Sequence, residues 1–327
     1  MPELKKVLVT AQLSRENMRR LEETLYPAVI YKCHPDDRAA IEKCIDDVDA
    51  AILAADAAPY VIAGKHLKWI HCCHAGLDQS ACPEVFSRGI VLTGSAGRSA
   101  PALAEHAVMF MLGLTYDLPM LQRAREKREW CSGALAARKA MNGKTVGIIG
   151  MGNTGRALVK LLKAFDMRIL AWRRKPDPEE GVEKVYSAQN GEKLKTMLEQ
   201  CDFVVLCAGL NDQTWHIINS ETLGQMRKGA CLINIGRGAL VDEAAMIESL
   251  RNGWLAGAGL DNFETEPLPE NSPLWDMPNV LMTPHATPCL EDREDRAVSY
   301  VLRNIEAFRR DGEFVNRLTE QDVYTHR

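Results

Sequence analysis

The first hundred residues show short apolar runs that alternate with amphipathic segments. Each run is rich in Val, Ile and Leu, as buried strands are, and the segments between them place apolar residues at helical spacing. Helices are expected at 14–25, with Ser14 as N-cap, and at 36–46. Strands are expected at 5–10, 28–33, 49–54, 68–73 and 89–94. This alternation predicts an α/β fold with a parallel sheet covered by helices on both faces.

The remaining residues repeat the alternation. A longer helix is expected at 101–118, and the polar segment 122–144 predicts an exposed helical arm. The second series of strands is expected at 145–150, 167–172, 203–208, 230–236, 256–261 and 279–283. Helices are expected between them near 154–165, 192–199, 220–227 and 242–252, and a last amphipathic helix at 290–312. The chain therefore predicts a second parallel sheet.

Composition limits the classes of partner. The 327 residues suggest two domains at roughly 100–200 residues each. A net charge of −4 favours neither nucleic acid nor an anionic membrane as partner. The longest apolar run, 107–112, is far shorter than the ~20 residues of a membrane helix. The N-terminus is typical of a first strand and not of a signal peptide, so we expect a cytoplasmic protein.

The stretch WIHCCHAGLDQS, 69–80, places two histidines around two adjacent cysteines. These residue types bind zinc and copper. Neighbouring side chains of a strand point to opposite faces, however, so the four cannot converge on one ion. The ten cysteines include no CxxC pair, and several lie in apolar strand-like runs. We therefore expect no metal site, and reduced thiols throughout.

The segment TVGIIGMGNTGRALVKLL has the GxGxxG spacing of a dinucleotide-binding turn. The pattern alone is weak, but here an apolar strand precedes it and an amphipathic helix follows. The first glycine permits the tight turn, the second a close approach of backbone to pyrophosphate, and the third close packing of helix and strand. The free N–H groups of the helix N-terminus would bind the phosphates. The expected cofactor contacts are Gly150, Met151, Gly152, Asn153, Thr154 and Gly155.

The second strand of this series ends in a basic pair. An NAD-binding fold usually carries an acidic residue about 20 positions after the glycines, to bind the ribose 2′-hydroxyl. This chain has Arg173 and Arg174 there instead. Guanidinium groups bind a 2′-phosphate with charge-assisted hydrogen bonds. The pair favours NADP(H), and NAD(H) stays open if the two arginines form only a solvated turn.

Three later segments place polar residues directly after apolar strands. They carry Arg237, the acids Glu264 and Glu266, and His285. In open α/β sheets, ligands bind outside the carboxyl ends of the strands. These side chains are therefore expected to meet in one crevice.

The segments GIIGMGNTGRAL, NIGRGALVDEAAMIESLRNGWLAGAGLDNFETEPLP and LMTPHAT occur in order along the chain. In sequence and spacing they resemble the D-isomer-specific 2-hydroxyacid dehydrogenases. That family includes glyoxylate/hydroxypyruvate reductases, phenylpyruvate reductases, D-lactate dehydrogenases and the dehydrogenase part of 3-phosphoglycerate dehydrogenases. The resemblance covers nearly the whole chain. It implies reduction of a small 2-oxo acid to the D-2-hydroxy acid with NADPH or NADH.

The resemblance also implies roles for individual residues. Arg237 would bind the substrate carboxylate and polarise the 2-oxo group, since a fixed cation stabilises the charge that develops on oxygen. His285 would be the general acid, and the base in the reverse direction. Glu266 would be its partner, with Glu264 as the competing choice. Asp261 would lie near the nicotinamide carboxamide, and Cys207, Ile235 and Gly236 would line the cofactor site.

The turn AGLD resembles the family's substrate loop. There, the backbone amides of Ala75, Gly76 and Leu77 would meet the substrate carboxylate opposite Arg237, and Gly76 lets the backbone come close. His74 stands at the entrance of this turn. A contact with the substrate side chain and a simple packing role are both open for it.

The family's organisation implies two Rossmann-like, doubly wound domains. The cofactor domain, 99–288, would be inserted into a discontinuous, flavodoxin-like substrate domain, 1–98 and 289–327. Hinges are expected near Ala100 and Pro288. Family members are commonly homodimers joined through the cofactor domain, so the arm at 120–142 is an expected interface. The segment LCAGLNDQT departs from many relatives around Cys207, which leaves the detail of the adenosine pocket open.

Two other functions were weighed. An NAD-linked dehydrogenase of a phosphorylated hydroxy acid would need cationic substrate loops, and 53–58 and 74–78 contain no Lys or Arg. A dinucleotide-sensing corepressor could keep Arg237, Glu266 and His285. It would also be expected to carry a long disordered tail, which this sequence does not show. A reductase is the favoured function.

Overall fold

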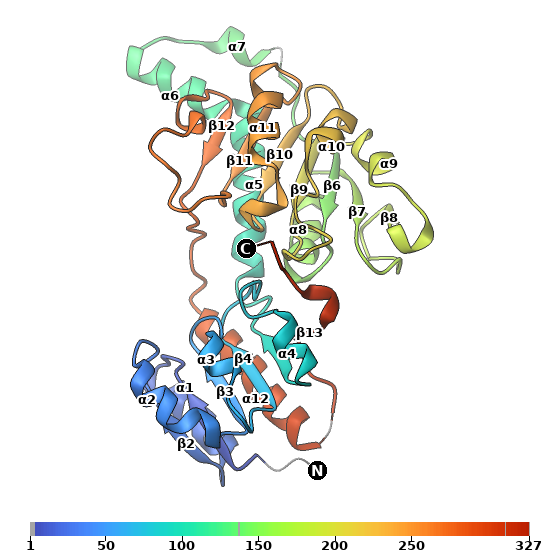
Figure 1. Ribbon diagram of the computed structural model, residues 1–327. Coiled ribbons are helices and arrows are strands. Elements are labelled where there is room, and N and C mark those ends of the chain that lie inside the picture. Colours follow the sequence, from blue (N-terminus) through green and yellow to red (C-terminus); the bar gives the residue numbers. More distant parts are fainter. Residues whose placement is uncertain (1–3, 137, 311, 327) are drawn as a thin grey trace. The chain divides into compact units, whose positions relative to one another are not determined.

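The computed structural model describes residues 4–136, 138–310 and 312–326. The chain forms two compact units (Figure 1). Unit 1 consists of Met1–Ser99 and Cys289–Arg327, and unit 2 of Ala100–Pro288. Unit 2 is thus inserted in the sequence of unit 1. The assignment of unit 1 to the substrate and unit 2 to the cofactor stays a prediction at this point.

Unit 1 is built on a six-stranded sheet in the order β13-β5-β4-β3-β1-β2. Strands β1 to β5 are parallel, and β13 pairs antiparallel with β5. The parallel order 2-1-3-4-5 is flavodoxin-like, and it reverses between β1 and β3. The strands are β1 (Lys6–Val9), β2 (Val29–Lys32), β3 (Ala50–Leu53), β4 (Trp69–Cys72), β5 (Val91–Gly94) and β13 (Arg317–Leu318).

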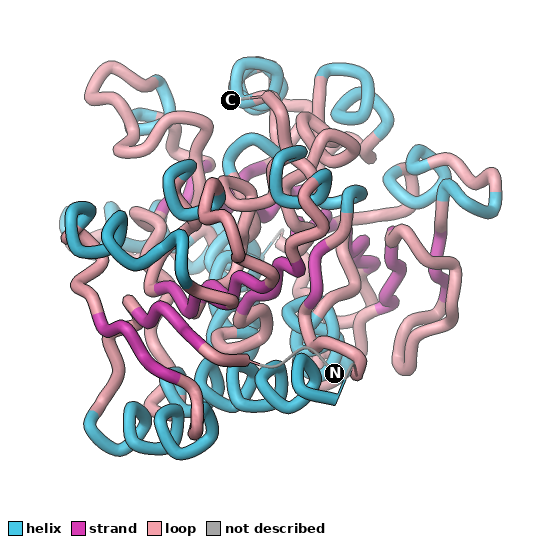
Figure 2. The backbone as a smooth tube through the Cα atoms, turned by 60° about the horizontal axis from the view of Figure 1, so that its bottom comes forward, coloured by secondary structure: helices cyan, strands magenta, loops and turns pink. Residues whose placement is uncertain are grey.

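Helices cover both faces of this sheet (Figure 2). Apolar side chains of α1 and α12, among them Leu21 and Ile305, share one buried core with the sheet, and α2, α3 and α4 share the other. Ser14 caps α1 through a hydrogen bond from the Asn17 N–H, as the sequence predicts. The helices are α1 (Arg15–Leu25), α2 (Arg38–Cys44), α3 (Pro59–Ile62), α4 (Pro83–Ser87) and α12 (Arg293–Arg310), with 3-10 turns at Ile45–Asp47 and Glu320–Asp322.

Unit 2 contains a seven-stranded, fully parallel sheet in the order β12-β11-β10-β9-β6-β7-β8. Read from β8 to β11, this is the Rossmann order 3-2-1-4-5-6, with its switch point between β6 and β9. The strands are β6 (Thr145–Ile149), β7 (Arg168–Trp172), β8 (Lys184–Tyr186), β9 (Phe203–Leu206), β10 (Cys231–Asn234), β11 (Gly257–Leu260) and β12 (Val280–Met282).

Two layers of helices enclose the unit 2 sheet. Helices α5 and α8 pack on one face through residues such as Phe110 and Leu158, and α9, α10 and α11 pack on the other. The helices are α5 (Ala100–Tyr116), α6 (Leu118–Lys127), α7 (Ser132–Ala136), α8 (Asn153–Lys163), α9 (Leu194–Leu198), α10 (Ser220–Gln225) and α11 (Glu243–Arg251), with 3-10 turns at Ala188–Asn190, Gly238–Leu240 and Pro273–Asp276.

The predicted fold class, two parallel α/β sheets, is confirmed. Two edge strands, β8 and β13, were not predicted, because each is too short to give an apolar run. The polar arm forms two short helices, α6 and α7. In the described ranges, no helix is both long enough and apolar enough to cross a bilayer.

The histidine–cysteine stretch lies at β4 and its end. The side chain of Cys72 belongs to the core under α2, α3 and α4, and that of Cys73 to the core under α1 and α12. The two neighbours therefore face opposite sides of the sheet, as predicted. Burial raises the pKa of Cys73 to about 12, so it stays a thiol. Among the described residues, no three His, Cys, Asp or Glu side chains are grouped as metal ligands would be.

Candidate active site

The turn after β6 has the shape that its three glycines predict. Gly150 has a φ of +99°. An added Cβ there would lie 2.4 Å from the Ala208 backbone N, and one at Gly155 would lie 2.4 Å from the Gly150 carbonyl. A Cβ at Gly152 would meet nothing within 4 Å. Two glycines are thus required by packing, while the third borders open space where a pyrophosphate can approach the backbone.

Helix α8 starts at this turn. Its N-cap is Gly152, which has no side chain to cap the first N–H groups. An uncapped helix N-terminus attracts anions through these groups and through the helix dipole. The side chain of Met151 is buried in the core beneath α5 and α8, so only its backbone can contact a cofactor. Asn153 and Thr154 form the first turn of the helix. The turn and the helix together fit a dinucleotide.

The basic pair follows the end of β7. Arg173 Nη1 donates to Glu179 Oε2 at 3.1 Å, and Arg156 Nε donates to Glu179 Oε1 at 2.9 Å. Hydrogen bonds from Arg156 first, and the charge of Arg173 with it, hold the pKa of Glu179 below its usual range. Arg174 accepts a hydrogen bond from Ser187 through its carbonyl. The ion pair between Glu179 and Arg173 was not predicted from the sequence.

Arg237 lies in a tight turn after β10. The side chain of Asn234 closes this turn. Its amide donates to the Arg237 carbonyl at 2.8 Å, and its Oδ1 accepts from the Gly236 N–H at 3.1 Å. At Gly238 a Cβ would lie 1.9 Å from the Phe263 carbonyl, so only glycine fits there. Asn234 is therefore a positioning residue for Arg237 that the sequence interpretation missed, although it lies within the NIGRG motif.

Cys207 and Ile235 begin the segments after β9 and β10. The Cys207 N–H donates to the Ile149 carbonyl at 2.8 Å, which joins this segment to the end of β6. Burial raises the pKa of the Cys207 thiol to about 12. The side chain therefore stays protonated and can make apolar contacts, but it is not a nucleophile. Ile235 is buried in the same core as Met151. Both residues line the strand ends where the cofactor is expected.

His285 lies after β12 and is paired with a carboxylate. Its Nδ1 is 2.7 Å from Glu266 Oε2, and the side chains are 48% and 35% exposed. Glu266 Oε1 also accepts from the Phe263 N–H at 3.0 Å, which fixes the carboxylate. His285 has a φ of +50°, an uncommon conformation for a residue with a Cβ. Such a backbone persists only where surrounding contacts hold it, and it is common at functional sites.

Asp261 provides those contacts. Its Oδ1 accepts from Thr283 Oγ1 at 2.7 Å and from the Ala286 N–H at 2.9 Å, and its Oδ2 accepts from Thr287 Oγ1 at 3.2 Å. Asp261 is 2% exposed. It fixes both sides of His285, a role that the sequence did not indicate. Its predicted contact with the nicotinamide carboxamide stays a prediction.

His106 completes this network from helix α5. Its Nδ1 and Nε2 lie 2.8 Å from Thr287 Oγ1 and 3.0 Å from Thr283 Oγ1. Burial lowers the pKa of His106, against the opposing charge of Asp261. The His106 ring contacts both threonines that flank His285. These contacts make His106 a positioning residue for the loop.

The structure separates the two glutamates that competed as partner of His285. Glu264 Oε1 lies 2.5 Å from His216 Nε2. The backbone N–H of Glu264 donates to Glu243 Oε2 at 3.3 Å. Glu266 is the residue that contacts His285. The His216–Glu264 pair was not predicted, because no motif joins residues of the segment 211–219 to the later acids.

In unit 1, the AGLD turn follows β4. Gly76 has a φ of +76°, a conformation that favours glycine. The Leu77 side chain is buried, and its carbonyl accepts from the Ser80 and Ala81 N–H groups at 3.0 and 2.7 Å. Leu77 can therefore contact a substrate only through its backbone. His74 Nε2 lies 3.7 Å from Asp56 Oδ2, and a substrate contact of His74 stays a prediction.

In unit 2, the predicted residues lie beyond the C-terminal ends of adjacent strands. Gly150 follows β6, the Ile235–Arg237 turn follows β10, Asp261 follows β11 and His285 follows β12. These strands are parallel members of one sheet, with β9 between β6 and β10, so their C-terminal ends lie along one edge of the sheet. Three features lie along this edge: the glycine turn, which fits a dinucleotide, the cation Arg237, and the pair of His285 and Glu266. This set suits hydride transfer with proton donation.

Residues 108–287 match the family described as D-isomer specific 2-hydroxyacid dehydrogenase, NAD binding domain. The chain is 33% identical to a glyoxylate reductase of Thermofilum pendens, over 97% of this chain and 95% of the relative. It is also 33% identical to a glyoxylate reductase of Pyrococcus horikoshii, over 97% of this chain and 96% of the relative.

Solved structures give the same result. A D-isomer specific 2-hydroxyacid dehydrogenase from Xanthobacter autotrophicus, in complex with NADPH and MES, is similar with a TM-score of 0.81 and 25% identity, over 98% of this chain and 99% of that one. An NADPH-dependent glyoxylate/hydroxypyruvate reductase from Sinorhizobium meliloti, in complex with NADP and sulfate, has a TM-score of 0.80 and 26% identity, over 97% and 98%. The chain therefore belongs to the D-isomer specific 2-hydroxyacid dehydrogenase family and is an NAD(P)-dependent oxidoreductase.

Proposed function

We propose that this enzyme reduces a small 2-oxo acid to the D-2-hydroxy acid and prefers NADPH. Arg237, Glu266 and His285 are the proposed catalytic residues. Ala75, Gly76 and Leu77 are the proposed substrate contacts from unit 1. The glyoxylate reductase relatives support the substrate class.

The observation that carries this proposal is the 2.7 Å contact between His285 Nδ1 and Glu266 Oε2. Because Nδ1 faces the carboxylate, Nε2 is the nitrogen left to hold the transferred proton. Glu266 stabilises the imidazolium and fixes the ring, as a carboxylate does beside a catalytic histidine. The network of Asp261, Thr283, Thr287 and His106 holds the loop in place.

The remaining chemistry follows from charge. When bound, the reduced nicotinamide supplies a hydride, and with it two electrons, to C2 of the 2-oxo acid. Arg237 binds the carboxylate and stabilises the negative charge that develops on the 2-oxygen. His285 then gives its Nε2 proton to that oxygen, which completes the hydroxyl group. In the oxidative direction, His285 removes this proton again.

The preference for NADPH rests on Arg173 and Arg174. Both follow β7, where an acidic residue would repel a 2′-phosphate. Glu179 holds Arg173 in a 3.1 Å ion pair, which orients the guanidinium and also offsets part of its charge. The NADPH and NADP complexes of the similar structures support this part of the proposal.

We also propose that the enzyme is a homodimer joined through unit 2. Four large apolar side chains are exposed on α5, on α6 and just past α6: Met109 (44%), Tyr116 (49%), Leu118 (48%) and Trp130 (94%). Contiguous exposed apolar side chains mark interaction surfaces, and these four come from one continuous stretch of chain, 109–130. Light scattering coupled to size exclusion should give twice the chain mass of 36.4 kDa. A monomer at micromolar concentration would refute the dimer.

The substrate proposal is tested by a panel of glyoxylate, hydroxypyruvate and phenylpyruvate, each with NADPH and with NADH. We expect turnover with at least one acid, and a higher kcat/KM for NADPH than for NADH. The decisive negative result is NADPH binding without turnover of any 2-oxo acid. It would favour a sensing protein over an enzyme.

A further inference from the structure

A polar pocket lies wholly within unit 1. It has a volume of about 320 Å³, within the size range of small-molecule sites. Ala11, Ala54 and Cys73 line it, and they follow the C-terminal ends of β1, β3 and β4. The strand order of unit 1 reverses between β1 and β3. Open α/β sheets bind ligands at this switch point. The pocket is therefore where the topology of unit 1 alone predicts a ligand.

Two arginines line this pocket. Arg98 directly precedes Ser99, the last residue of the first segment of unit 1, and Arg293 is the first residue of α12. Arg98 Nη1 donates to the Cys73 carbonyl, and Arg293 Nη1 lies 2.7 Å from Cys289 Sγ. The Arg293 Nε is buried and has no hydrogen-bond partner. A buried donor without an acceptor is unfavourable, so a ligand that offers an acceptor to this nitrogen would be stabilised.

Arg98 and Arg293 line the same pocket, so their like charges share one small space. Burial first, and the charge of Arg293 second, lower the pKa of Arg98. No carboxylate is among the groups that act on Arg98, and in the described part of the chain no carboxylate forms an ion pair with either arginine. Burial of like charges without a counter-charge is unfavourable. An anion between them would remove this cost.

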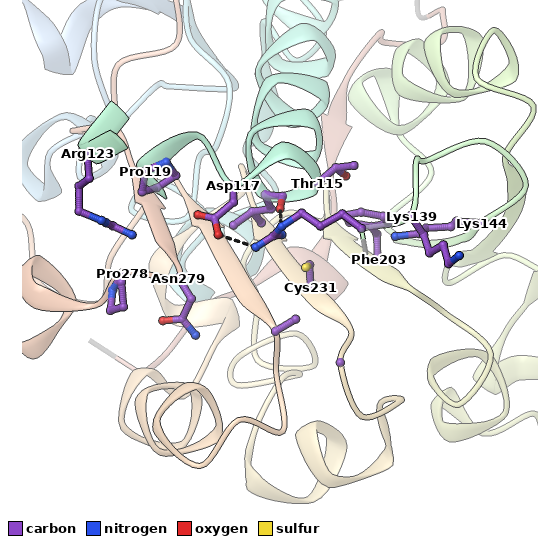
Figure 3. A pocket seen from close by; sticks show the side chains of 14 residues that line it. Thr115, Asp117, Pro119, Arg123, Lys139, Lys144, Phe203, Cys231, Pro278 and Asn279 are labelled. Atoms are coloured by element: carbon purple, nitrogen blue, oxygen red, sulfur yellow. Dashed lines mark hydrogen bonds and ion pairs between the residues drawn. The ribbon is translucent and has the colours of Figure 1, made fainter. Parts of the chain in front are cut away.

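A pocket of unit 2 shows the usual arrangement (Figure 3). It has a volume of about 410 Å³ and lies at the N-terminal ends of β9 to β12, with Asp117 near its centre. Arg138 in that pocket donates to the Asp117 carboxylate and, at 3.1 Å, to the Leu114 carbonyl. There Arg138 has a carboxylate partner. In the described part of the chain, neither Arg98 nor Arg293 has one, although Glu291 and Glu294 border their pocket.

Two glutamates also border the unit 1 pocket. Glu294 Oε1 accepts from the Ser14 N–H at 2.9 Å and from the Asn17 amide at 2.8 Å, so it is used in capping α1 against α12. Glu291 is exposed to solvent. Neither reaches an arginine of the pocket as an ion-pair partner.

We propose that Arg98 and Arg293 form a binding site for a small phosphorylated molecule at the β1/β3 switch point of unit 1. A phosphate dianion can accept charge-assisted hydrogen bonds from both guanidinium groups, because each offers several N–H donors in one plane. The volume leaves room for an organic part beside the phosphate. The buried Arg293 Nε gains its acceptor, and the two cations gain their counter-charge.

The site shares backbone with the AGLD turn. Arg98 donates to the carbonyl of Cys73, and the Ser95 N–H donates to the carbonyl of His74 at 2.9 Å. These residues lead directly into Ala75 and Gly76. A bound phosphate that fixes Arg98 would therefore stiffen the start of the turn and lower the KM for the 2-oxo acid. This regulatory consequence rests on the proposed function, whereas phosphate binding itself does not.

The test measures thermal unfolding of the full chain with saturating NADP⁺ present. The probes are inorganic phosphate and glycerol 2-phosphate, with malonate and chloride at matched ionic strength. Wild type should gain about 3 °C in Tm with either phosphate compound, and the gain should saturate. The double variant R98M/R293M should lose the gain. R296M should keep it, because Arg296 lies on the same helix but pairs with Asp292 at 2.8 Å.

A second readout separates binding from a structural role. Without phosphate, R293M removes the repulsion and the unpaired Nε, so its Tm should rise by about 2 °C. A purely structural arginine would give a lower Tm. R293K, which keeps the charge and loses the fork, should show an intermediate gain with phosphate. An equal gain in wild type and R98M/R293M, or a gain with malonate alone, would overturn the proposal. Absence of 2-oxo acid turnover would leave the binding result unaffected.

Discussion

Two histidines of this chain occupy opposite kinds of environment. His71 lies in the middle of unit 1, within β4, and is fully buried. Its ring nitrogens lie 2.9 and 3.2 Å from the hydroxyl groups of Thr93 and Ser95. His285 lies beyond the end of β12 in unit 2, is half exposed and contacts a carboxylate. The residue type is the same, but only His285 has access to a ligand.

The difference shows how position on a parallel sheet decides the chemistry of a side chain. Burial lowers the pKa of His71 to about 3, with a smaller effect from His74, so it stays neutral at physiological pH. It is a packed polar group in a core. His285 has a carboxylate beside its Nδ1 and is about half exposed to solvent. A strand end thus allows proton transfer, and a strand interior prevents it.

The largest effect expected from this comparison concerns His285. H285A should lower kcat about 10²- to 10⁴-fold, because general acid catalysis contributes this much. The KM for NADPH should change little. H216A is the matched control, since His216 also contacts a glutamate, and should keep kcat within about threefold. A kcat near that of wild type in H285A would mean that another group donates the proton.

The carboxylate partners of the two histidines, Glu266 beside His285 and Glu264 beside His216, allow the same comparison. E266Q removes the charge that faces His285 Nδ1 and should lower kcat about 10²-fold, less than loss of the histidine. E264Q disturbs the pair with His216 and should change kcat less than about threefold. Steady-state kinetics with a saturating 2-oxo acid distinguishes the two. Equal losses in both variants would argue against the assignment of Glu266.

The two ends of β7 give a further contrast. Arg173 and Arg174 follow its C-terminal end, whereas Arg168 opens it and pairs with Glu183 at 2.6 Å. R173D/R174A should lower the preference for NADPH over NADH at least ~10-fold, the worth of a charged hydrogen bond. R168A should leave the ratio of kcat/KM values unchanged. E179Q should raise the preference, since it frees Arg173 from its partner. An unchanged ratio in R173D/R174A would refute the NADPH assignment.

The smallest effect on activity is expected at His71. At neutral pH, H71Q should keep kcat within about twofold. Its effect lies in stability. Because the folded pKa is depressed, the unfolded chain binds the proton first, and folding loses stability as the pH falls from 6.5 toward about 3. In this pH window, the free energy of unfolding of wild type, measured by urea denaturation, should fall by up to ~1.4 kcal/mol per pH unit more than that of H71Q. Parallel pH profiles would contradict a buried neutral His71.

The alternation of apolar runs was enough to predict both sheets, because strands buried on two faces need continuous apolar sequence. The strand-end rule likewise led to Arg237, Glu266 and His285 as candidates. The short edge strands β8 and β13 were missed, since they bury too little to leave a pattern.

The supporting contacts of the site were not predictable from local sequence. His106 and Thr287 are hydrogen-bonded across 181 residues of chain, and no motif joins them. The same holds for Arg98 and Arg293, which come together only in the folded unit. Charge balance is a property of three-dimensional neighbours. Sequence patterns report which side chains leave a strand end, but not which partners they find there.

In the proposed reaction, the His285 imidazole transfers the proton at the strand ends of unit 2. Chemical rescue tests it most directly. The side chain is 48% exposed, so exogenous imidazole can reach the space left in H285A. We expect imidazole to raise the kcat of H285A at least ~10-fold and saturably, with little effect on wild type. An undiminished kcat in H285A, or the same stimulation of variant and wild type by imidazole, would contradict it.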